Sequence, residues 1–158
     1  MKNTVKEKTM ESDRPQKISI DHDDYHAEHI GRTKKGEQFF LTTPFEPAID
    51  EKKGCEYIAL FKFDNEGNLL EHIIDEIGPR GSYDKNERKE KYLARLNELG
   101  EVKYCRIEVK PFSIERNGVE FGLITREPED EEDVWSVELL PGNYMAFFEP
   151  WDSGDYDT

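Results

Sequence analysis

Apolar and polar residues alternate along much of the chain, which is the pattern of strands with one buried face. The alternating stretches are rich in Val, Ile, Phe and Tyr, residues that favour strands, and Gly, Pro, Asn or Asp separate them. Strands are expected at residues 17–20, 38–43, 57–63, 104–109, 112–116 and 119–125, and two more around Pro141-Gly142.

Two turns define hairpins within this pattern. Asn117-Gly118 separates two of the alternating stretches and is the residue pair best suited to a tight two-residue turn. The segment 64–68 begins with Asp and has Gly at its fourth position, which favours a turn followed by a left-handed residue. Residues 69–74 also fit helical spacing, but this turn favours the second arm of a hairpin.

One segment has the repeat of an amphipathic helix, over about residues 84–99. Asp84 and Glu87 have the spacing of a capping box, and Gly100 suits a left-handed C-terminal cap. The apolar stripe consists of Tyr92, Leu93, Leu96 and Leu99. The remaining charged face, which includes Lys85, Arg88, Lys89, Lys91 and Arg95, is expected to be a solvated helix surface.

These elements predict an α+β fold: a mostly antiparallel sheet of about seven or eight strands with the helix packed on one face. Residues 1–16 have no apolar periodicity and are expected to form a mobile leader. Residues 17–158 are expected to form a single domain with an acidic C-terminal region. The aromatic content of 11% favours a folded chain despite a charged content of 37%.

The net charge of −14 is concentrated near the C-terminus. Residues 127–158 contain eleven acidic side chains and no Lys or Arg. Such a surface repels nucleic-acid phosphate and anionic lipid, so we expect a protein partner with a basic surface and no direct nucleic-acid binding. The chain has neither an apolar run of membrane-spanning length nor the apolar core of a secretory signal, which makes the cytoplasm the expected location.

Two acidic segments are candidate partner-binding surfaces. The first is the acidic loop, which is either solvated or a surface that faces a cationic partner, and it consists of Glu129, Asp130, Glu131, Glu132 and Asp133. In the C-terminal tail the rings either fold back over the sheet or anchor a basic partner that the aspartates steer. Its candidate residues are Trp151, Asp152, Asp155, Tyr156 and Asp157.

Catalytic and metal-binding patterns are sparse. His22, His26 and Asp24 lie in a stretch with the ingredients of a metal site, but nothing predicts the helix that would place both imidazoles on one face. Cys55 and Cys105 are too far apart for a metal motif and suit buried thiols. Because nucleophile-elbow and dinucleotide-binding patterns are missing as well, we expect no cofactor and no catalytic activity.

Four stretches resemble a family of small bacterial proteins labelled formate hydrogenlyase regulatory protein HycA. They are IGRTKKGEQFF, FKFDNEGNLLE, EVKYCRIEVKPFSIERNGVEFGLI and EPWDSGDYDT, within roughly residues 30–158. The resemblance implies a regulator of a formate-oxidising, hydrogen-evolving system that acts by contacting another protein. It assigns no catalytic residue.

Three functional hypotheses follow. The first is a non-enzymatic cytoplasmic binding or regulatory protein whose acidic C-terminal surface contacts a protein partner. The second is an immunity protein that masks the basic cleft of a nuclease toxin, which the same size and charge would suit. The third is a metal-dependent enzyme that uses His22, His26 and nearby carboxylates.

Overall fold

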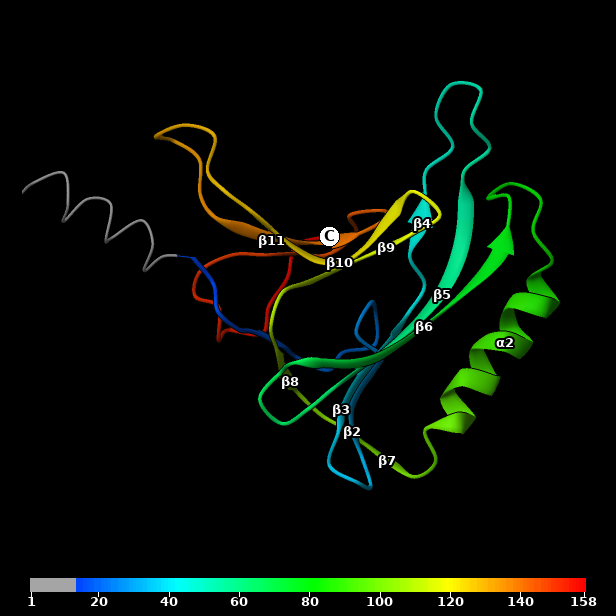
Figure 1. Cartoon of the computed structure of the whole chain (residues 1–158), viewed down its shortest axis with the longest axis horizontal. Coiled ribbons are helices and arrows are strands. Elements are labelled where there is room, and N and C mark those ends of the chain that lie inside the picture. The colour runs from blue at the N-terminus through cyan, green and yellow to red at the C-terminus, as the bar shows by residue number, and fades with distance from the viewer. Residues whose placement is uncertain (1–13) are drawn as a thin grey trace, which may run out of the picture.

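A computed structural model describes residues 14–158, which contain one helix and twelve strands (Figure 1). In chain order these are β1 (Ile18–Ile20), β2 (His29–Thr33), β3 (Gln38–Thr42), β4 (Phe45–Glu46), β5 (Cys55–Phe63), β6 (Leu69–Gly78), α2 (Lys85–Glu98), β7 (Val102–Tyr104), β8 (Ile107–Val109), β9 (Phe112–Arg116), β10 (Val119–Arg126), β11 (Ser136–Leu140) and β12 (Ala146–Phe147). The expected α+β class is confirmed. The first thirteen residues of the expected mobile leader, 1–16, lie outside the described residues.

The strands form three antiparallel sheets. One has six strands in the order β4-β5-β3-β2-β7, with β6 also paired to β5. A second has four strands in the order β12-β11-β10-β9, and β1 pairs with β8 in a third. The expectation of one strand over residues 104–109 is wrong, because β7 pairs with β2 whereas β8 pairs with β1. This split and several strands of two or three residues explain why the strand number exceeds the predicted seven or eight.

Strand β5 pairs with β3, β4 and β6 in the six-stranded sheet and is buried on both faces. Alternate residues Tyr57, Ala59, Phe61 and Phe63 contribute to a larger core between the six-stranded and four-stranded sheets. Ile58 and Leu60, which alternate with them, contribute to a smaller core under α2. A strand buried on both faces must be apolar at consecutive positions, which explains why residues 57–61 contain no polar side chain other than the Tyr57 hydroxyl.

The four-stranded sheet and the short β1–β8 pair close the larger core. From the four-stranded sheet come Phe121, Leu123, Val137, Leu139 and Phe147, all at most 2% exposed. The hairpin between β9 and β10 turns at Asn117-Gly118 with φ values of 52° and 78°, as the sequence predicts. The turn between β5 and β6 is also as predicted, and the Asp64 carboxylate accepts the Glu66 and Asn68 amide protons.

Helix α2 covers the opposite face of the six-stranded sheet (Figure 1). The Asp84 carboxylate caps it by accepting the Asn86 and Glu87 amide protons, and Gly100 has the left-handed φ of 71° after its end. Tyr92 and the two leucines at 96 and 99 pack on the smaller core. The expected apolar stripe is wrong at Leu93, which is 46% exposed and does not pack on the smaller core.

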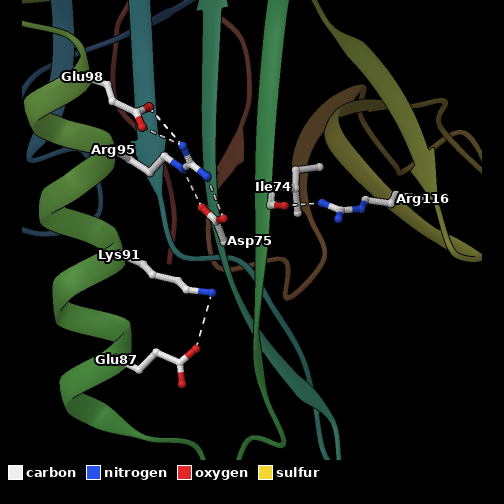
Figure 2. A network of polar contacts seen from close by, with 7 residues as sticks. All are labelled: Ile74, Asp75, Glu87, Lys91, Arg95, Glu98 and Arg116. Carbon is white, nitrogen blue, oxygen red and sulfur yellow. Dashed lines mark hydrogen bonds and ion pairs between the residues drawn. The ribbon is translucent and has the colours of Figure 1, made fainter.

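A bidentate ion pair joins the last turn of α2 to the sheet (Figure 2). Arg95 donates from Nε and Nη2 to the Asp75 carboxylate of β6 at 2.7 and 2.8 Å, and from Nη1 to Glu98. These bonds hold the pKa of Asp75 below its usual range. Figure 2 also shows Arg116 of β9 donating to the Ile74 carbonyl of β6, a contact between the two larger sheets.

We expect Asp75→Asn to lower the free energy of unfolding by about 2 kcal/mol, because it removes a charged partner from a largely buried pair. The matched control Lys91→Gln breaks the exposed pair with Glu87 on the same helix and should cost about 0.5 kcal/mol or less. Urea unfolding followed by circular dichroism measures both. Equal effects of the two substitutions would contradict a special role for the Arg95 pair.

The same pair predicts a pH dependence with a definite sign. Because the folded-state pKa of Asp75 lies below its usual value of 3.8, the pair contributes its full stability above pH 3.8. That contribution is lost as the pH falls through the lowered pKa. The stability difference between the natural protein and Asp75→Asn should therefore shrink below pH 3.8, in urea titrations at stepped pH, and should stay constant from there to neutral pH.

Candidate functional site

The C-terminal tail is bound along the N-terminal end of the domain. The Ser19 amide donates to the Trp151 carbonyl at 2.9 Å, and the Asp21 amide donates to the Gly154 carbonyl at 3.0 Å. Further along, the backbones of Ala146 and Asp157 exchange two hydrogen bonds. The tail is therefore part of the hydrogen-bonded fold.

Arg106, which lies between β7 and β8, holds the tail against the N-terminal segment by three hydrogen bonds. Its Nε donates to the Asp21 carboxylate at 2.6 Å. Its two other nitrogens donate to the carbonyls of Asp152 and Ser153 at 2.9 and 2.8 Å. One guanidinium thus joins the N-terminal strand segment to the turn of the tail, and this fork geometry is specific to arginine.

The two rings of the tail fold back on the larger core. Trp151 and Tyr156 are half-buried and pack against it. The Tyr156 hydroxyl donates to the Asp23 carboxylate, and burial together with this bond raises the pKa of Tyr156 to about 12. These contacts agree with the interpretation of the tail as a cover. The side chains of Asp152, Asp155 and Asp157 remain exposed, so their role in partner binding stays a prediction.

The acidic loop joins β10 to β11 and extends away from the body of the molecule (Figure 1). Two of its carboxylates order its backbone. Asp130 accepts the amide protons of Glu132 and Asp133 at 2.9 Å each. Asp133 accepts those of Glu129 and Val134 at 3.0 and 2.8 Å, and these bonds lower the pKa of Asp133.

The structure separates the candidate metal ligands. His22 Nε2 is bonded to the Glu28 carbonyl at 2.8 Å, and its ring stacks on Tyr104. The His26 ring packs against Tyr25 and Tyr144, and Asp24 is exposed. Within residues 14–158, no three His, Cys, Asp or Glu side chains are grouped so that they could hold a metal ion. Cys55 and Cys105 are both free thiols, the first buried and the second partly buried.

A cavity of about 630 Å³ lies between the first turns of α2, the end of β3 and the segment that precedes β2. We refer to it as the helix cavity. The helix contributes Lys85, Arg88 and Lys89, and the segment before β2 contributes Tyr25 and His26. Three members of the helix face that was expected to be simply solvated therefore line a concave site.

Sequence reasoning missed the helix cavity for a clear reason. The spacing of Lys85, Arg88 and Lys89 places them on one side of a helix, so their mutual proximity was readable. The proximity of Tyr25 and His26 was not readable, because these residues lie some sixty positions earlier in the chain. Only the packing of α2 on the sheet creates this neighbourhood.

We expect Arg106→Gln to loosen the C-terminal tail, because glutamine cannot make the three bonds of the guanidinium. Hydrogen exchange followed by NMR should show faster exchange of the Ser19 and Asp21 amides. Arg126→Gln is the matched control, since Arg126 pairs with Glu138 on the four-stranded sheet and makes no tail contact. Unchanged protection of the Asp21 amide in Arg106→Gln would show that the backbone bonds alone hold the tail.

Comparison of the chain with protein-family models, curated proteins and solved structures found no match. The resemblance to the HycA family thus stays a prediction from the quoted stretches. Within residues 14–158, α2 is too short and too polar to cross a membrane.

Proposed function

We propose that this protein is a non-enzymatic regulatory protein that binds a basic surface of a protein partner through its acidic loop, Glu129–Asp133. One observation carries the proposal: two carboxylates of the loop order its backbone, while the other three are presented outward without an ion-pair partner in the described part of the chain. These three are Glu129, Glu131 and Glu132.

Such a loop is suited to recognition for two physical reasons. Carboxylates held close together repel one another in the free protein, and a cationic partner relieves that repulsion. The bonds made by Asp130 and Asp133 also reduce the conformational entropy that the loop would lose on binding. Next to the acidic residues, Val134 is 58% exposed and offers an apolar contact at the edge of the charged surface.

The exposed aspartates of the tail extend the same negative character. Because the tail backbone is bonded to β1 and β12, Asp152, Asp155 and Asp157 occupy defined positions on the surface. The proposal fits a regulator of the kind the HycA resemblance implies, which acts by contacting another protein. It fits equally an immunity protein that covers the basic cleft of a toxin, since both partners would present the same cationic chemistry.

A charge-matched pair of triple variants tests the role of the acidic loop. The first carries Glu129→Gln, Glu131→Gln and Glu132→Gln. The second, the control, replaces three exposed glutamates elsewhere with glutamine, at positions 51, 66 and 115. Both should unfold within about 0.5 kcal/mol per substitution of the natural protein, because the altered side chains are exposed.

We expect the loop variant to lose a partner that the natural protein and the scattered variant both retain. Affinity capture from a lysate of the native host at low and high salt, with quantitative mass spectrometry, makes the comparison. The captured partner should carry a basic surface, should dissociate at high salt, and should bind the loop variant about tenfold more weakly. Equal retention by both triple variants would exclude the acidic loop as the binding surface.

A further inference from the structure

The helix cavity has a local charge opposite to that of the whole protein. Lys85, Arg88 and Lys89 line it, and Glu28 is the single carboxylate on its wall. Within residues 14–158, none of these three cations forms an ion pair. Other basic residues of the same helix do, since Lys91 pairs with Glu87, and Arg95 with Asp75. In a chain of net charge −14, unpaired cations gathered in a cavity favour an anionic ligand.

Arg88 is the best-placed anion ligand of the three. Its Nε is buried and lacks a hydrogen-bond acceptor among the described residues. The guanidinium makes no hydrogen bond to another described residue, and because Arg88 lines the cavity its accessible N–H groups can bind an anion there. The guanidinium carbon lies 5.8 Å from the centre of the Tyr83 ring. Burial raises the pKa of Tyr92, which also lines the cavity, so its hydroxyl is neutral at pH 7.

Aromatic rings from the segment before β2 also line the helix cavity. The ring centres of Tyr25 and His26 are 3.9 Å apart, and Tyr25 is 68% exposed. Burial lowers the pKa of His26 below its usual 6.5, so this imidazole is neutral at pH 7 and offers a planar face in place of a charge. The volume of about 630 Å³ lies within the usual range for small-molecule sites.

We propose that the helix cavity binds a small planar anion: an aromatic or heteroaromatic ring that packs against Tyr25 and His26 and carries an anionic group held by Arg88. Lys85 and Lys89 stand one turn apart beside Arg88 and attract the anion against the negative field of the protein. A carboxylate and a phosphate share this chemistry. The site is separate from the acidic loop, so the proposal does not depend on the partner-binding function.

Four probes added to the full chain distinguish the parts of this proposal. Benzoate carries a ring and a carboxylate, and adenosine 5′-monophosphate carries a ring system and a phosphate. Adenosine supplies the rings without the charge, and inorganic phosphate supplies the charge without a ring. Binding is followed by two-dimensional NMR at the Arg88 Nε–H and at the amides of Thr42 and Thr43, which are at the cavity wall.

We expect at least one of the two ring-bearing anions to bind ten times more tightly than either adenosine or inorganic phosphate. Benzoate binding would identify a carboxylate ligand, and nucleotide binding would identify a phosphate ligand. The proposal is overturned if neither ring-bearing anion shifts these resonances at millimolar concentration. It is also overturned if inorganic phosphate binds as tightly as the ring-bearing anion that binds best.

Substitutions then test the assigned residues with the probe that binds. Arg88→Gln should raise its dissociation constant at least tenfold. Lys91→Gln, which removes the same charge from the same helix outside the cavity wall, should leave it within twofold. Tyr25→Ala alters an exposed ring and should weaken binding severalfold without loss of folding. Equal weakening by Arg88→Gln and Lys91→Gln would show a general charge effect and would contradict a built anion site.

Discussion

Burial of β5 on both faces is the constraint on which the rest of the structure depends. A strand in this position needs a cover on each side, because its alternate apolar side chains would otherwise be left in water. The four-stranded sheet supplies one cover through Phe121 and Leu123, and α2 supplies the other through Tyr92 and Leu96. No residue of the helix is fully buried, so apolar contacts hold α2 on the sheet only weakly. The Arg95–Asp75 ion pair adds to them.

The acidic loop and the cationic residues of the helix cavity lie in different parts of the molecule. Figure 1 places the acidic loop and α2 on opposite sides of the molecule, with the sheets between them. The acidic loop therefore presents uncompensated carboxylates on one side, while the helix cavity gathers Lys85, Arg88 and Lys89 on the other. This separation keeps the two sets of charges from neutralising each other. The two proposed binding surfaces therefore do not overlap.

The C-terminal tail shows how one segment can have a structural and a surface role together. Its backbone is bonded to β1 and β12, and its rings cover part of the larger core. Arg106 ties this segment in place because it occupies the break between β7 and β8, which belong to different sheets. The carboxylates of this segment are exposed to water, so they lower the stability of the fold very little.

The sequence by itself determined the local features of this protein. The helix, its Asp84 cap, the turn at Asn117-Gly118 and the solvent-exposed acidic loop all follow from interactions within a few residues, which a local pattern records. Only the tertiary structure decided the features that join distant segments. Three features depend on which strands pair and which face the helix covers: the division of residues 104–109 between two sheets, the bonds of Arg106 to the tail, and the presence of Arg88 and Tyr25 in one cavity. Strand pairing and the face that the helix covers depend on how apolar residues from the whole chain are buried together, so no short stretch of sequence determines them.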